Sequence, residues 1–150
     1  RRPNPIRENF AVANHPRSDL STGGNQGAAM LARRATPMYL VSDLDEARSN
    51  YEALGFEPKP TNDDGCLGVI AGSTSVILLD REYAERALPA RAIALLEEKP
   101  ALYIWVESLD SMRAELQARF LGEANMAGLR EWAVESPLGL MVLAETSRAN

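Results

Sequence analysis

The sequence has few of the side chains that metal and redox chemistry commonly use. Its 150 residues include one histidine, His15, and one cysteine, Cys66. A single cysteine cannot form a disulfide within the chain, and tight transition-metal sites need several converging imidazole, thiolate or carboxylate groups. The sequence also contains no glycine-rich phosphate loop, Ser-His-Asp set or zinc-ligand spacing. These absences argue against a disulfide-stabilised secreted domain and against the commonest nucleotide and zinc sites.

Long apolar segments are missing as well. No run approaches the roughly 18 apolar residues of a transmembrane helix. The first ten residues lack the apolar core of a signal peptide. Because the chain starts with Arg1 rather than Met, we expect it to be trimmed or a fragment. We expect a cytoplasmic protein that does not associate with membranes.

Charge is distributed unevenly along the chain. Residues 1–35 carry a net charge of +4, whereas the remainder carries −9, which together give the overall −5. An acidic body repels nucleic acids and anionic lipids. We therefore expect no nucleic-acid partner. Residues 1–35 are also poor in periodic apolar positions and rich in Asn, Pro, Ser and Gly, which predicts a disordered tail.

One pattern, V-x-x-L-D-x-x-R, occurs twice. It covers residues 41–48 and 106–113, so the two copies lie 65 residues apart. Each copy follows a short apolar run that is typical of a strand. Self-similarity at a fixed spacing indicates a duplicated supersecondary unit.

Both copies predict a strand that leads into an amphipathic helix. In the first, residues 37–41 form the strand, Asp43 caps the helix and Gly55 ends it. In the second, residues 101–106 form the strand and Ser108 is the cap. The apolar stripe of the second helix is predicted to contain Leu109, Met112, Leu116 and Phe120, with Gly122 at its end.

The remaining segments predict further strands and a helical connector. Two prolines place residues 56–60 at a sheet edge, and residues 66–71 and 75–80 form a hairpin. Residues 81–99 predict a helical connector interrupted at Pro89. Residues 130–135 and 138–145 predict two final strands. The fold class is α+β, with two β-α-β-β-β modules and a mostly antiparallel sheet. The predicted organisation is a tail (1–35), one domain (36–146, with modules 36–80 and 101–146 joined by the connector 81–100) and a C-terminal tail (147–150).

Two stretches resemble a known superfamily. Val-Ser-Asp-Leu-Asp at 41–45, followed by Tyr51 and Leu-Gly-Phe at 54–56, is similar to the opening of the vicinal oxygen chelate superfamily. Residues 130–139 resemble its closing strand-turn-strand. That group includes glyoxalase I, extradiol dioxygenases and bleomycin resistance proteins. The resemblance covers about residues 36–145 and implies that the sheets of both modules curl around a cavity.

The resemblance also implies positions for a divalent metal. They fall on Thr36, Ala101, Leu143 and a position near residues 78–80. Three of these four places hold residues that bind metals poorly, so we expect no metal and no cofactor. A carboxylate-only site that uses Asp80, Glu131 or Glu145 is the alternative.

Alternation along strands predicts which side chains face the implied cavity. Thr36, Met38 and Leu40 share one face of the first strand, and the resemblance turns that face inward. The predicted ligand-binding residues are Met38, Leu40, Tyr103, Trp105, Trp132, Met141 and Leu143. The alternative is that these residues pack a closed core, with Trp132 buried or at an interface. We expect Cys66 to be a small buried apolar residue and not a nucleophile, because no histidine is expected nearby to activate its thiol.

The leading hypothesis is a metal-free binding protein of the bleomycin-resistance-like type, with antibiotic resistance as the corresponding role. It would sequester a small, partly aromatic molecule, which can be a cation. The resemblance to this superfamily also implies a homodimer. The first alternative is an enzyme of the same superfamily that uses Glu131 or Glu145 as a base, although the missing ligands favour a protein that is not an enzyme. The second is a dimerisation or regulatory module whose cavity is packed shut.

Overall fold

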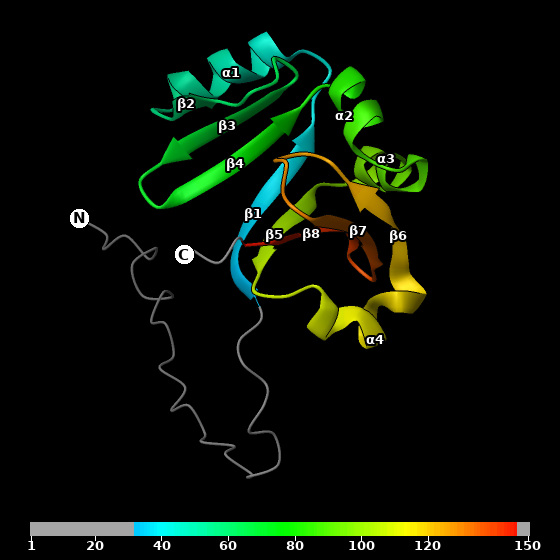
Figure 1. Cartoon of the computed structure of the whole chain (residues 1–150). Helices are drawn as coiled ribbons and strands as arrows, with labels where there is room; N and C mark the ends of the chain where they lie inside the picture. The colour runs from blue at the N-terminus through cyan, green and yellow to red at the C-terminus, as the bar shows by residue number, and fades with distance from the viewer. Residues whose placement is uncertain (1–31, 147–150) are drawn as a thin grey trace, which may run out of the picture.

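Eight strands form one open, curled sheet in the order β2-β3-β4-β1-β5-β8-β7-β6 (Figure 1). The computed structural model describes residues 32–146. The strands are β1 (Ala32–Leu40), β2 (Glu57–Pro60), β3 (Cys66–Ala71), β4 (Thr74–Leu79), β5 (Ala101–Val106), β6 (Phe120–Ala124), β7 (Glu131–Ser136) and β8 (Gly139–Glu145). The helices are α1 (Leu44–Ala53), α2 (Arg81–Ala87), α3 (Ala90–Glu98) and α4 (Arg113–Leu116). No helix within residues 32–146 is long and apolar enough to span a membrane.

The predicted duplication is confirmed by the strand pairing. β1 pairs in parallel with β4 in the first module, and β5 pairs in parallel with β8 in the second. All other pairs are antiparallel, including the pair of β1 with β5 that joins the modules. Because equivalent strands meet antiparallel at the centre, the two modules are related by an approximate local twofold axis. The α+β class and the mostly antiparallel sheet are as predicted.

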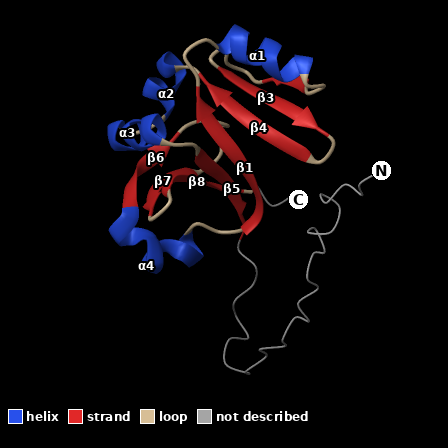
Figure 2. Ribbon diagram, turned by 180° about the vertical axis from the view of Figure 1, so that it is seen from behind, coloured by secondary structure: helices blue, strands red, loops and turns tan. Residues whose placement is uncertain are grey.

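Helices cover the two faces of the sheet differently. Figures 1 and 2 show α1 outside the first half of the sheet, α4 outside the second half, and α2 with α3 between the halves. We call the concave face that carries α2 and α3 the inner face, and the opposite one the outer face. Three apolar clusters result: one at the inner face and one beneath each outer helix.

The first module follows its sequence pattern closely. The Asp43 carboxylate accepts a hydrogen bond from the Glu46 N–H at 3.0 Å, so α1 begins at the predicted cap. The apolar stripe of α1 packs on the outer face of β3 and β4, with the ring of Tyr51 edge-on to that of Phe56. The proline-containing β2 lies at one end of the sheet, as predicted.

The connector is helical and interrupted at the predicted proline. α2 starts after Asp80, whose carboxylate accepts from the Tyr83 N–H at 2.8 Å. Pro89 has an extended backbone and precedes the first residue of α3. α3 then contacts β1, β7 and β8 from the inner side, where its buried side chains join the largest apolar cluster. The connector thus fills much of the concave space.

The second module departs from the prediction in its helix. The expected helix through Phe120 is reduced to α4, with 3-10 turns at 110–112 and 117–119. Phe120 already lies in β6, and its ring packs edge-to-face on Trp132 at a centroid distance of 5.5 Å. This tertiary contact and the pairing of β6 with β7 override the helical periodicity. Gly122 ends no helix: at φ +150°, it lies so close to Pro89 that an added Cβ would stand 2.7 Å from the proline Cγ.

The boundaries of the domain also shift slightly. β1 begins at Ala32, so residues 32–35, which the sequence assigns to the tail, are the first part of a strand. The predicted tails at residues 1–31 and 147–150 lie outside the described residues.

We predict that Asp43→Ala lowers the free energy of unfolding by about 1 kcal/mol, because the first turn of α1 loses its side-chain acceptor. Ser108→Ala is the matched control from the second module. The Ser108 hydroxyl lies 3.4 Å from the Ser111 N–H, too far for a strong bond, so the loss should be below about 0.5 kcal/mol. Urea denaturation followed by circular dichroism measures both, and equal losses would contradict this account.

Candidate functional site at the inner face

Four of the predicted ligand-binding residues lie on the inner face. Met38 and Leu40 of β1 and Tyr103 and Trp105 of β5 all belong to the inner apolar cluster or pack against it. The alternation of side chains along both strands predicts that these four residues point to the same face of the sheet. The face they form is the one that the resemblance turns toward the cavity.

The other three predicted residues lie on the outer face, which corrects the prediction for β8. Met141 and Leu143 pack in the cluster beneath α4, as does Trp132. The hairpin between β7 and β8 has only two loop residues, so Ser136 pairs directly with Gly139. The inward side chains of β8 are consequently Leu140, Val142 and Ala144. A register difference of one residue moves every side chain of a strand to the other face.

The connector helices bury part of the inner face. Met38 is 0% exposed and Tyr103 is 2% exposed, so both belong to a closed core. Leu40 and Trp105 are only partly buried. The alternative of a closed core therefore holds for the centre of the concave face. The end of this face near Trp105 is only partly buried.

Arg34 lies over the indole of Trp105 and connects it to two hydroxyl side chains of the neighbouring strands. The guanidinium carbon of Arg34 lies 5.1 Å from the centroid of the indole. Nη2 of Arg34 donates to the Ser75 hydroxyl at 2.7 Å, and the hydroxyl oxygens of Ser75 and Thr36 are 3.1 Å apart. The ring of Tyr103 meets the indole edge-on at 4.7 Å. We call Arg34, Thr36, Ser75 and Trp105 the Trp105 cluster.

Arg34 and Ser75 were not among the predicted site residues. Arg34 was assigned to the tail, although continuing the alternation of Thr36, Met38 and Leu40 two residues back would have placed it on the inner face. Ser75 comes from β4, which pairs in parallel with β1. Its proximity to Thr36 depends on that pairing, and no local pattern reveals it.

Glu131 is a buried carboxylate whose hydrogen bonds are all structural. It is 2% exposed. One oxygen accepts from the Tyr103 hydroxyl at 2.5 Å, and the other accepts from the N–H groups of Met126 (2.7 Å) and Ala127 (3.1 Å). Burial and the neighbouring carboxylate of Glu131 raise the pKa of the Tyr103 hydroxyl far above its usual range. Glu131 thus ties the loop between β6 and β7 to β5.

The residues do not fit the divalent metal that the sequence resemblance implies. Thr36 is hydrogen-bonded to Ser75, Ala101 offers only a methyl group, and Leu143 lies on the outer face. The alternative carboxylates lie apart: Asp80 caps α2, Glu131 is engaged as described, and Glu145 accepts from the Leu109 N–H at 2.9 Å. In residues 32–146 no three His, Cys, Asp or Glu side chains gather in a way that could hold a metal. His15 lies outside the described residues.

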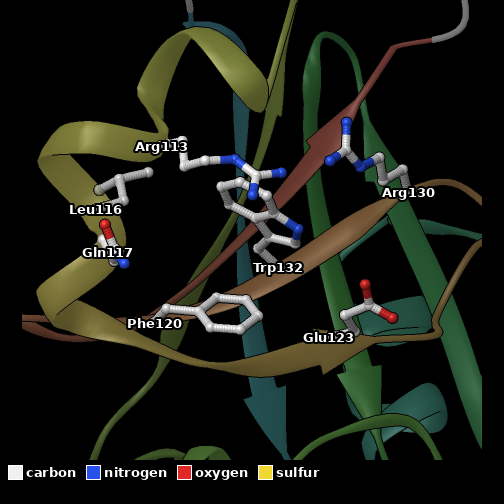
Figure 3. Close-up of a pocket in the computed structure, with 7 residues that line it drawn as sticks. All are labelled: Arg113, Leu116, Gln117, Phe120, Glu123, Arg130 and Trp132. Carbon is white, nitrogen blue, oxygen red and sulfur yellow. The ribbon is translucent and has the colours of Figure 1, made fainter.

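Trp132 lines a separate pocket on the outer face, between α4 and β6 (Figure 3). Its volume is about 300 Å³. It is lined by Arg113, Leu116, Gln117, Phe120, Glu123, Arg130 and Trp132, which we call the Trp132 pocket. Trp132, which is 7% exposed, therefore lines a pocket on the outer face and not the concave cavity for which it was predicted.

The guanidinium groups of two arginines lie close to the indole of Trp132. The guanidinium carbons of Arg113 and Arg130 lie 5.5 and 5.4 Å from its centroid. Asp110 binds both: Arg130 donates through both terminal nitrogens at 3.0 and 3.1 Å, and Arg113 donates at 3.2 Å. The two guanidinium groups, Arg130 first, lower the pKa of the Asp110 carboxyl. An exposed carboxylate in the 3-10 turn before α4 thus binds both cations.

Cys66 is placed as a small core residue. It is 8% exposed, and burial raises the pKa of its thiol to about 11. A buried thiol that stays protonated near neutral pH is a poor nucleophile. This placement agrees with the predicted apolar role.

Comparison with known proteins identifies the fold. Neither a family model nor a curated protein sequence matches this chain. It is similar in structure to a glyoxalase/bleomycin resistance protein/dioxygenase superfamily member from Vibrio splendidus, with 14% identity, a TM-score of 0.54, and coverage of 75% of this chain and 98% of that one. The chain therefore has the fold of the vicinal oxygen chelate superfamily, which its sequence resembles.

Two further likenesses are weaker. Methylmalonyl-CoA epimerase from Mycobacterium tuberculosis has 18% identity and a TM-score of 0.48, with 78% of this chain and 88% of that one covered. An uncharacterized protein from Methanosarcina mazei has 17% identity and a TM-score of 0.46, with 81% and 98% covered. At these scores neither likeness carries an argument about activity.

We predict that Glu131→Gln lowers the free energy of unfolding by about 1–3 kcal/mol. The amide nitrogen cannot accept, so either the Tyr103 hydroxyl or the loop N–H groups lose their acceptor in a buried place. Glu135→Gln on the same strand is the control: its pair with Arg91 is exposed and should be worth about 0–1 kcal/mol. Denaturant unfolding compares them, and an unchanged stability of Glu131→Gln would refute the structural role.

We also predict that Cys66 reacts with a disulfide reagent at least about 100-fold more slowly in the folded protein than in the unfolded one at about pH 8. The raised pKa of the thiol reduces its thiolate fraction, and burial restricts access. Absorbance of the released thiolate, measured with and without guanidinium chloride, gives the two rates. Comparable rates would show that this thiol is accessible.

Proposed function

We propose that this protein binds a small, partly aromatic molecule at the Trp105 cluster and leaves it chemically unchanged. The observation that carries the proposal is the partly exposed indole of Trp105, which has over its face a guanidinium group that donates to the Ser75 hydroxyl. A flat apolar surface with a few convergent polar groups is the usual composition of a small-molecule site. The cluster lies where the connector helices leave the concave face accessible.

The polar groups define the charge of the preferred ligand. Arg34 already presents a cation to the aromatic face, and its side chain is exposed. A guanidinium group suits a carboxylate or another planar anion, to which it donates paired hydrogen bonds. The cluster therefore favours an anionic aromatic ligand over the cationic one that the acidic sequence suggested. A homodimer remains part of the proposal, because it is implied by the sequence resemblance.

Binding without turnover fits the groups at hand. A general base must reach the reacting proton through a hydrogen bond. Glu131 already accepts three hydrogen bonds inside the core, and Glu145 lies at the Leu109 N–H and 3.6 Å from Arg130. The Trp105 cluster itself offers hydroxyls and a guanidinium group. The enzymatic alternative thus has less support than sequestration.

The two tryptophans of the chain allow a direct test, because each gives one indole N–H signal in a ¹H–¹⁵N correlation spectrum. We predict that 2-naphthoate shifts the Trp105 signal of the full chain, whereas 2-naphthylmethylamine shifts it much less. Arg34→Gln should weaken naphthoate binding about tenfold, the loss expected for one charge-assisted hydrogen bond. EDTA should leave the affinity unchanged.

Arg33→Gln is the matched control. It removes a guanidinium group one residue away, which pairs with Glu107 instead of the cluster. Its naphthoate affinity should equal that of the unaltered protein. If neither compound moves the Trp105 signal, the proposal is wrong. The result would then favour the alternative of a module whose cavity is packed shut.

A further inference from the structure

We propose that the Trp132 pocket is a second binding site, for a small zwitterion with a flat apolar body, such as an aromatic α-amino acid. The pocket lies on the outer face, away from the Trp105 cluster, so the inference is independent of the proposed function. Its volume of about 300 Å³ matches a ligand of that size.

The apolar part of the pocket is an aromatic corner. Phe120 is 44% exposed, and its ring stands edge-to-face against Trp132, which is itself only 7% exposed. The buried side chain of Leu116 closes the side beneath α4. A planar ring can therefore stack on the exposed phenyl ring against the edge of the indole, an arrangement that aromatic pairs prefer.

A carboxylate partner is available on one side of this corner. Figure 3 shows Arg113 and Arg130 on the same side of the indole, opposite the strand that bears Phe120. Arg130 uses both terminal nitrogens on Asp110, but Arg113 uses only Nη2. The other N–H donors of Arg113 make no hydrogen bond within residues 32–146, and its guanidinium group lies over the indole that lines the pocket.

An ammonium partner is available on the other side. Glu123 lies on β6 directly opposite Trp132 in the strand pairing, and it lines the pocket beside Phe120. Within residues 32–146 its exposed carboxylate takes part in no hydrogen bond or ion pair.

The arrangement of charge selects the class of ligand. A purely anionic molecule would meet Arg113 but also the carboxylate of Glu123, and a purely cationic one would meet Glu123 but also two guanidinium groups. A zwitterion satisfies both sides at once. Complementary charge at both ends gives specificity beyond the apolar contact.

Three probes of equal ring size test this inference on the full chain. They are L-phenylalanine, 3-phenylpropionate, which lacks the ammonium group, and 2-phenylethylamine, which lacks the carboxylate. We expect phenylalanine to shift the indole N–H signal of Trp132 with the highest affinity of the three, while the signal of Trp105 stays in place. Signals are assigned with Trp132→Phe and Trp105→Phe.

Two variants separate the roles of the charges. Arg113→Gln should weaken phenylalanine and 3-phenylpropionate about tenfold without weakening 2-phenylethylamine. Glu123→Gln should weaken phenylalanine about tenfold without weakening 3-phenylpropionate. Arg119→Gln and Glu115→Gln are matched controls, because both side chains are exposed nearby and do not line the pocket. The controls should bind all three probes as the unaltered protein does.

The inference is overturned if no probe shifts the Trp132 signal, or if all three bind equally and neither variant changes their order. The second result would indicate apolar adsorption alone. Because Trp105 and Trp132 report separately, failure here is distinguishable from failure of the proposed function.

Discussion

The antiparallel pairing of β1 with β5 is the interaction on which the rest of the structure depends. Each module alone is a four-stranded sheet with an unpaired inner edge, and such an edge would invite association with another chain. The pairing closes both edges at once and makes one sheet of eight strands. It also brings Thr36 opposite Tyr103 and Arg34 opposite Trp105, so that the side chains of the Trp105 cluster come together from separate modules.

The connector determines what remains of the concave face. Both of its short helices contribute buried side chains to the inner apolar cluster, and α3 packs against β1, β7 and β8. A cavity through the whole half-barrel would leave a large apolar area exposed to water, at a cost of about 25 cal/mol per Å². By covering the centre, the connector confines access to the end of the sheet near Trp105.

Much of the fold could be predicted from sequence because several local signals agreed. The repeated V-x-x-L-D-x-x-R pattern, the capping Asp43 and the interruption at Pro89 each have a short-range physical cause, and each is confirmed. The second helix could not be predicted in this way, because Phe120 gains more from Trp132 and from strand pairing than from continuing a helix. Its apolar spacing fits either structure.

The site was less predictable because it depends on register and on contacts between distant segments. The resemblance placed Leu143 inward, but in the register set by the two-residue hairpin it lies on the outer face of β8. Ser75 reaches Thr36 through the pairing of β4 with β1. Asp110 accepts hydrogen bonds from both Arg113 and Arg130, and the bond to Arg130 joins segments 20 residues apart. None of these relations is local in sequence.

The hydrogen bonds of Glu131 have a consequence for the motions of the molecule. The loop after β6 is attached through its Met126 and Ala127 N–H groups to the Glu131 carboxylate, which also accepts from Tyr103 on strand β5 of the same module. If the loop lifted away, the buried Glu131 carboxylate would lose two of its three hydrogen-bond donors, and such an opening is costly. The amide protons of these two loop residues should therefore exchange with solvent only when the sheet itself opens. A surface loop in this protein thus belongs to the same cooperative unit as the core.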